Sequence, residues 1–164
     1  MERIKVFIMD VDGTMTDGKI YMGTSGELFK AFNIKDGYGI HEILPENGVT
    51  TVIMTGRASE IVSNRAKELD IDIVLQGIKD KRSAVLELAD RLQCKREEMA
   101  YIGDDIIDIS AIEECGVAAC PNDAVKEVRE VCDYICKKEG GAGAVREFIE
   151  WLQQSNLLIG GIKQ

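Results

Sequence analysis

The chain has 164 residues, 45% of them hydrophobic and 30% charged, and carries a formal net charge of −9 at pH 7. These values are typical of one globular domain and exclude a disordered or fibrous protein. The acidic balance argues against a nucleic-acid partner, which needs a basic surface, and no apolar run approaches the roughly 20 residues that span a bilayer.

The chain begins with a short apolar run, residues 4–9, which predicts a first strand. The run is too short, and too poor in preceding basic residues, to be a signal peptide, so we expect a cytoplasmic protein. Five cysteines are an odd number and form no Cys-x-x-Cys pair, which argues against a disulfide framework or a structural zinc site. We interpret Cys132 and Cys136, one helical turn apart, as reduced packing residues.

Short β-rich runs alternate with amphipathic stretches along the whole chain. The strands are predicted at 5–9, 50–54, 71–75, 99–102 and 117–119, with a weaker one at 134–135. The helices are predicted at 37–46, 58–69, 81–92, 106–114, 124–131 and 142–154. This alternation predicts an α/β fold: a single domain, 1–164, with a doubly wound, mainly parallel, Rossmann-like sheet.

One segment, residues 16–33, breaks the alternation directly after the first strand. Strand-like runs at 19–22 and 28–32 flank glycines at 23 and 26, which predicts a β-hairpin flap, with a surface loop as the alternative. Ligands of doubly wound sheets bind at the carboxyl ends of the strands, so the flap would lean over such a site as a lid or an assembly element.

Two groups of aspartates follow predicted strands. Asp10 and Asp12 come after the first strand, and Gly13 allows the backbone to turn so that both address one site. Asp104 and Asp105 follow the strand 99–102, with Asp108 one turn further. Carboxylates that converge in this way need a cation, and oxygen ligands suit Mg²⁺. The alternative, that they only cap helices, does not explain two such groups at two buried strand ends.

Groups of opposite polarity follow two other strands. Thr55, Gly56 and Arg57 follow the strand 50–54 and open the next predicted helix, where a hydroxyl and backbone amides can hold a phosphate; a Thr N-cap without a ligand is the alternative. Lys79 lies just before the predicted helix 81–92, and Lys81 begins it. We choose Lys81 as the ammonium that faces the phosphate.

These motifs, in this order, resemble those of the haloacid dehalogenase superfamily, most closely its small capless 3-deoxy-D-manno-octulosonate 8-phosphate (KDO 8-phosphate) phosphatases. The resemblance rests on residues 10–13, 16–18, 31–40, 55–57, 60–62, 65–66, 76–77, 80–81, 101–105, 108 and 140–147. Thr14 and Met15 depart from the subfamily's usual Val-Leu, and the tail after Trp151 is shorter. Both departures leave the substrate less certain than the reaction.

The resemblance implies an Mg²⁺-dependent phosphatase that works through an aspartyl-phosphate. Asp10 would be the nucleophile and Asp12 the acid and base, with the pKa of Asp12 above that of Asp10. The Mg²⁺ ligands would be the Asp10 carboxylate, the Asp12 carbonyl and Asp104, with Asp105 orienting them without binding the ion directly. Groups that would bind the substrate are Thr55, Gly56 and Lys81 for the phosphate, and Arg57, Arg65, Lys30 and Asn33 for the sugar acid.

The resemblance also implies a homotetramer in which the flap of one subunit covers its neighbour's site and brings Lys30 or Asn33 to it. The segment from about 140 to 164 is predicted to be mobile. Three alternatives remain open: a phosphatase of nine-carbon sialic-acid-type 9-phosphates, a non-catalytic domain like those fused to cytidylyltransferases, and a response-regulator-like binding module. Arg57 after Thr55-Gly56 favours the eight-carbon sugar, and the intact motifs favour an enzyme.

Overall fold

Six short apolar segments form one parallel sheet in the computed structural model, which describes residues 2–158. The strand order is β5-β4-β1-β6-β7-β8, which confirms the predicted doubly wound parallel sheet. Its strands are β1 (Val6–Met9), β4 (Thr50–Met54), β5 (Ile73–Leu75), β6 (Met99–Ile102), β7 (Val117–Cys120) and β8 (Tyr134–Ile135). Register pairs Val6 with both Thr50 and Met99, so β1 lies at the centre of the sheet.

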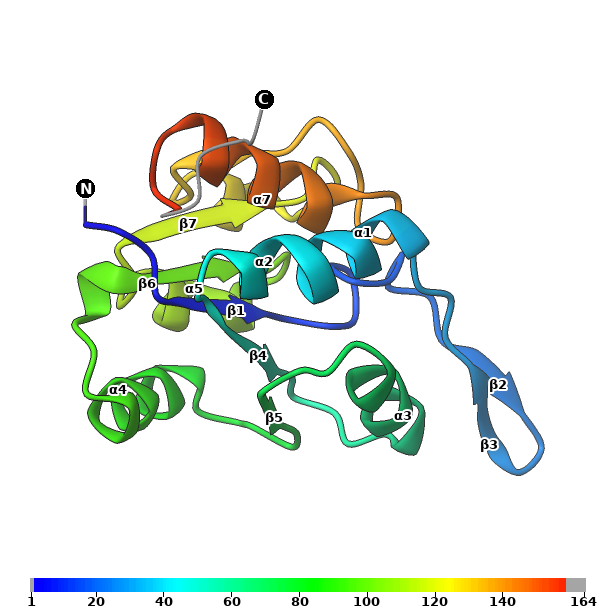
Figure 1. Ribbon diagram of the computed structural model, residues 1–164. Helices are drawn as coiled ribbons and strands as arrows, with labels where there is room; N and C mark the ends of the chain where they lie inside the picture. Colours follow the sequence, from blue (N-terminus) through cyan, green and yellow to red (C-terminus); the bar gives the residue numbers. More distant parts are fainter. Residues whose placement is uncertain (1, 159–164) are drawn as a thin grey trace.

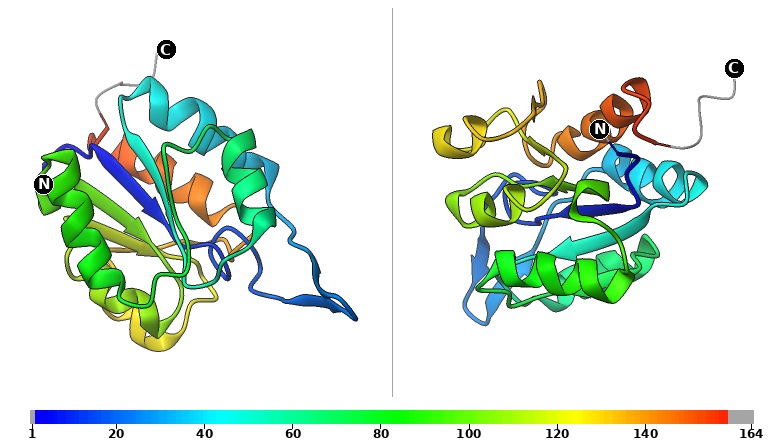
Figure 2. Two further views of the ribbon diagram at one scale, coloured as in Figure 1. Left: turned by 90° about the horizontal axis from the view of Figure 1, so that it is seen from below. Right: turned by 90° about the vertical axis from the view of Figure 1, so that its left-hand side faces the viewer.

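Alternation along β1 divides the core into two layers. Phe7 and Met9 belong to one apolar cluster, and Val6 and Ile8 belong to the other. The first layer packs under α1 (Ile34–Tyr38), the π-helical turn η1 (Gly39–Ile43), α2 (Leu44–Glu46), α3 (Glu60–Glu68) and α7 (Ala144–Gln154). The second packs under α4 (Lys81–Leu92), α5 (Ile106–Ile112) and α6 (Lys126–Arg129). Figure 2 shows helices on both sides of the sheet.

Five of the six predicted helices differ in their limits from those expected, and α4 matches. The helix predicted at 37–46 begins at Ile34, because the side chain of Asn33 accepts a hydrogen bond from the amide of Lys35 and caps it. The helix predicted at 58–69 begins at Glu60, after Ser59 as N-cap. The helix predicted at 124–131 is reduced to α6, of four residues.

The flap is the hairpin that the glycine pattern predicts, and not a loop. Its strands, β2 (Tyr21–Gly23) and β3 (Gly26–Phe29), pair antiparallel as a sheet of their own. The rings of Tyr21 and Phe29 stack 4.4 Å apart across it. Figure 1 shows the hairpin projecting from the body of the molecule.

Three further sequence expectations concern membrane spans, the cysteines and the C-terminal segment. Across residues 2–158, no helix is long and apolar enough to cross a membrane, and all five cysteine thiols there are free. The segment predicted to be mobile includes α7, whose Phe148 is fully buried against Phe7 with ring centroids 5.5 Å apart. Its residues 159–164 lie outside the described residues, and the mobility stays a prediction.

Candidate active site

Three carboxylates converge at the carboxyl edge of the sheet. Asp10 directly follows β1, and its amide donates to the carbonyl of Ile102 at the end of β6. Asp104 lies just beyond β6, and Asp108 lies in the first turn of α5. One oxygen of each carboxylate lies within 4.8 Å of the others. The fold therefore brings together the two aspartate groups that the sequence places far apart.

Gly13 allows the chain after Asp10 to approach Asp104 closely. It has φ +96°, and a Cβ there would lie 2.0 Å from Oδ2 of Asp104. The hydroxyl of Thr14 donates to Oδ1 of Asp104 over 3.0 Å. The residue that departs from the subfamily's pattern thus contacts a carboxylate of the cluster.

Lys81 supplies a buried positive charge among these carboxylates. It begins α4, its exposed fraction is 1%, and its Nζ donates to Oδ1 of Asp10 (2.8 Å) and Oδ1 of Asp108 (2.6 Å). Lys79, the other candidate, is exposed. Burial alone would lower the pKa of Lys81, but the charges of Asp10 and Asp108 raise it above its ordinary value.

The carboxylate cluster contains Asp108, whereas Asp105, which was predicted to orient the metal ligands, is not part of it. Asp105 is exposed and caps α5, accepting from the amide of Ile106. Asp108 is fully buried and accepts from four donors: Lys81, the hydroxyl of Tyr101 (2.6 Å) and the amides of Asp104 (3.0 Å) and Asp105 (3.1 Å). A carboxylate has about four lone-pair positions, so Asp108 is filled by protein donors and is suited to hold Lys81.

The ionised forms of Asp10 and Asp104 are disfavoured unless a further cation lies nearby. Burial, together with the charge of Asp108, raises the pKa of Asp10 to about 6, although Lys81 opposes the shift. Burial and the charges of Asp10 and Asp108 raise the pKa of Asp104 to about 8. Three carboxylates face a single ammonium, which is why the pKa values of Lys81, Asp10 and Asp104 are all raised.

This donor set fits a small divalent cation. Asp10 and Asp104 offer oxygen atoms that are not saturated by protein donors, and their raised pKa values are those of a site that lacks one positive partner. Hard oxygen ligands of this kind suit Mg²⁺.

Asp12 faces a second group of charges at the base of the flap. Nζ of Lys30 lies 2.5 Å from Oδ1 of Asp12 and 2.9 Å from Oε1 of Glu27, and the Lys30 side chain is 1% exposed. Arg57 reaches Asp12 (3.8 Å) and Glu27 (3.3 Å). Lys30 therefore contacts Asp12 of its own chain, and Glu27, which carried no motif in the sequence, contacts both cations.

Thr55 and Gly56 lie in a loop and do not open a helix. Thr55 is buried at the end of β4, where its amide donates to Leu75 and its carbonyl accepts from Ile78. Because α3 starts only at Glu60, the expected cradle at a helix N-terminus is wrong in that detail. Any phosphate contact here would come from the Thr55 hydroxyl and the Gly56 amide alone.

Asn33 and Arg65 make contacts that are structural. Both ends of the Asn33 amide are used, since Oδ1 accepts from Lys35 and Nδ2 donates to the carbonyl of Gly141 (3.2 Å). Arg65 pairs with Glu68 at 2.8 Å and lies over the ring of Phe32. The structure joins neither of them to the carboxylates around Asp10 through these contacts.

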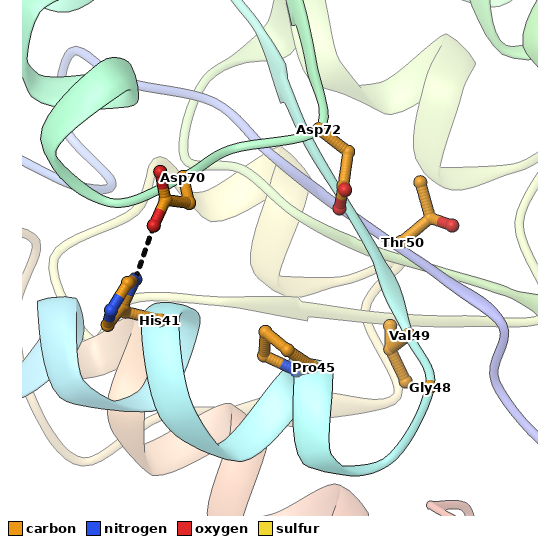
Figure 3. Close-up of a pocket in the computed structure, with 7 residues that line it drawn as sticks. All are labelled: His41, Pro45, Gly48, Val49, Thr50, Asp70 and Asp72. Atoms are coloured by element: carbon orange, nitrogen blue, oxygen red, sulfur yellow. Dashed lines mark ion pairs between the residues drawn. The ribbon is translucent and has the colours of Figure 1, made fainter.

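A hollow of about 470 Å³ lies elsewhere, at the amino end of β4. It is shown in Figure 3 and is lined by His41, Pro45, Gly48, Val49, Thr50, Asp70 and Asp72. Among the described residues that line it, His41 pairs with the exposed Asp70 over 3.7 Å, and Asp72 already accepts from the amide and hydroxyl of Thr51. Its size does not make it the better candidate, because parallel α/β sheets bind ligands at the opposite edge.

Comparison with known proteins gives a consistent picture. Residues 71–149 match the family model of haloacid dehalogenase-like hydrolases. The chain is 43% identical over 144 residues to the 3-deoxy-D-manno-octulosonate 8-phosphate phosphatase KdsC of Yersinia pestis, covering 88% of this chain and 76% of that protein. It is 40% identical over 151 residues to KdsC of Escherichia coli K12, covering 92% and 80%.

Solved structures agree with these relatives. One is the phosphatase of the same name from Moraxella catarrhalis, in complex with magnesium ion, phosphate ion and KDO, with TM-score 0.89, 41% identity and coverage of 93% of this chain and 87% of that one. Another is the cobalt-bound enzyme of Haemophilus influenzae, with TM-score 0.89, 34% identity and coverage of 93% and 89%.

Proposed function

This chain belongs to the KDO 8-phosphate phosphatase family of haloacid dehalogenase-like hydrolases, and we propose that it uses Mg²⁺ to release phosphate from KDO 8-phosphate with Asp10 as nucleophile. The chain is a phosphatase, and KDO 8-phosphate is the substrate that its relatives' names favour over a nine-carbon sugar or a non-catalytic role. The observation that carries the proposal is the buried Asp10 carboxylate held against Lys81 beside Asp104.

Asp10 is placed to attack phosphorus. Its oxygen would form a bond to phosphorus as the bond from phosphorus to the sugar oxygen breaks, leaving an aspartyl-phosphate. Asp12 would give a proton to the departing sugar oxygen and then take one from the water that hydrolyses the intermediate. Lys30 and Arg57 fix the position of the Asp12 side chain, two residues beyond Asp10.

Lys81, the Thr55 hydroxyl and the Gly56 amide would neutralise the oxygens of the transferring phosphoryl group. Asp108 would hold Lys81 in place, since its four donors leave it no free oxygen position. The residues that would hold Mg²⁺ are the Asp10 and Asp104 carboxylates and the Asp12 carbonyl. The bound ion supplies positive charge to the carboxylates and to the phosphoryl oxygens.

Arg57 is the better of the two arginines for the sugar's carboxylate. It is half exposed beside Asp12, and Glu27 holds its guanidinium there. A planar guanidinium suits bidentate binding of a carboxylate. Arg65, engaged with Glu68 and Phe32, has weaker support.

The flap supports a further part of the proposal, a homotetramer with shared sites. Its outer residues Met22, Leu28 and Phe29 are 62%, 59% and 51% exposed, which leaves an apolar surface that a second copy could cover. The neighbour's flap would then exclude water from a site that has no cap domain.

A panel of sugar phosphates tests the substrate. We expect the highest kcat/KM for KDO 8-phosphate with Mg²⁺ present, a lower value for a nine-carbon keto-acid 9-phosphate, and the lowest for hexose phosphates. A variant Arg57→Lys keeps the charge but loses the bidentate geometry, and should reduce the preference for keto acids over hexoses. A clear preference of the unchanged protein for hexose phosphates would contradict the keto-acid substrate while leaving a phosphatase.

A further inference from the structure

The glycine-rich turn before α7, residues 140–143, packs against the loop that follows Asp10 and Asp12. A Cβ on Gly140 would lie 1.9 Å from the carbonyl oxygen of Gly13, and a Cβ on Gly141 would lie 2.6 Å from the amide nitrogen of Asp17. Gly141 has φ +71°, and its amide donates to the carbonyl of Thr14 over 3.1 Å. Because no side chain fits between them, the turn touches the backbone of residues 13–17 directly.

Asn33 ties this turn to the base of the flap. It directly precedes α1, where its Oδ1 accepts from the amide of Lys35 at 2.9 Å, and its Nδ2 donates to the carbonyl of Gly141 at 3.2 Å. One partner is a donor and the other an acceptor, so both ends of the amide are in use. A single side chain therefore joins the end of the flap, the start of α1 and the glycine turn.

A second contact joins α1 directly to α7. Oδ1 of Asp36 accepts from the amide of Arg146 in the first turn of α7, over 2.8 Å. The Gly140 amide in turn donates to the carboxylate of Asp123 over 2.9 Å. The contacts of Asn33 and Asp36 with Gly141 and Arg146, which we call the clasp, join α1 to α7 beside the catalytic loop.

We propose that Asn33 is a positioning residue of the phosphatase reaction, which fixes the loop of Asp10 and Asp12 through Gly141 and does not bind the sugar. The inference rests on the roles proposed above for Asp10 and Asp12. The loop that follows Asp12 contacts the glycine turn through the backbone carbonyls of Gly13 and Thr14. Misplacement of a reacting group by about 1 Å can cost about 100-fold in rate, so a loosened turn should lower turnover.

Two substitutions separate the clasp from the helix cap. Asn33→Ser keeps an N-cap acceptor for Lys35 but is too short to reach Gly141, and Asn33→Asp keeps the acceptor but has no donor for the Gly141 carbonyl. We expect both variants to lower kcat about tenfold or more, with KM within about twofold of the original value. Asn33→Ala, which loses both contacts, should be no more active than Asn33→Ser.

The split between kcat and KM decides the role. A sugar ligand at residue 33 would raise KM and leave kcat nearly unchanged, and that result would overturn the proposal. An unchanged kcat in both cap-keeping variants would overturn it as well.

Hydrogen–deuterium exchange without substrate supplies a readout that does not depend on the reaction. In Asn33→Ser, peptides from 11–18 and 139–143 should exchange several-fold faster, whereas a peptide from α4 serves as the unchanged control. Equal exchange in the two proteins would contradict the clasp. An Asp10→Asn variant as active as the unchanged protein would instead refute the proposed function, and the exchange result would still decide the contact of Asn33 with Gly141.

Discussion

Lys81 shows how a single residue connects folding to chemistry. Its ammonium is buried and shared by Asp10 and Asp108, so its removal leaves carboxylates without a protein cation. We predict that Lys81→Met lowers the free energy of unfolding by about 3–5 kcal/mol in EDTA and by less in millimolar Mg²⁺. Urea unfolding measures both values, with the exposed Lys79→Met as control. Equal losses for the two lysines would contradict the account.

Asp36 gives the protein a pH-dependent stability that is separate from the metal ligands. Burial raises its pKa from 3.8 to about 6, and its Oδ2 has no hydrogen-bond partner. An acid whose pKa is higher in the folded than in the unfolded protein stabilises the folded state when it is protonated. This contribution is fully present below the unfolded pKa and is lost as the pH rises through about 6.

The stability of the unchanged protein relative to Asp36→Asn should therefore fall between pH 4 and pH 7, by up to about 3 kcal/mol. Asparagine retains the acceptor for Arg146, so urea unfolding of both proteins across this range isolates the titration. A difference that stays constant with pH would show that Asp36 does not titrate there.

At the scale of elements, the ends of the strands could be predicted because each strand is a short run of apolar and β-branched residues that stops at polar ones. The predicted limits of β4 and β6 match the structure, so the position of Asp104 just beyond β6 was also predicted. The choice between Asp105 and Asp108 could not be made, because both follow one strand and only the capping geometry of α5 assigns Asp105 to the helix end. The contact of Glu27 with Lys30 and Arg57 depends on how the flap folds back toward the loop before α3, which no local pattern encodes.

Helix α7 is held to the sheet by its aromatic face. Phe148 is fully buried, with Phe7 below it and Trp151 5.9 Å away along the helix. Phe148→Ala should lower the free energy of unfolding by about 3–5 kcal/mol through lost burial and a cavity. The exposed Gln154→Ala is the control, and urea unfolding is the measurement. A loss below about 1 kcal/mol would show that α7 packs loosely.

At the scale of the whole molecule, the proposed tetramer predicts a concentration-dependent size. The chain should elute as a species about four times its 18.1 kDa mass at micromolar concentration. Replacing two exposed flap residues, Met22→Glu with Leu28→Glu, should shift it to smaller species and lower kcat/KM, because charge opposes burial of this surface. Light scattering after size exclusion measures the mass. A monomer at these concentrations would contradict the shared site.

The role of Asp10 as nucleophile is tested most directly by kcat/KM for KDO 8-phosphate in Mg²⁺ before and after Asp10→Asn. Asparagine keeps the shape of the side chain but cannot form the aspartyl-phosphate, so kcat/KM should fall by at least about 1,000-fold. The exposed Asp90→Asn, made on α4, should leave it unchanged. Near-native activity of Asp10→Asn would contradict the account of this site.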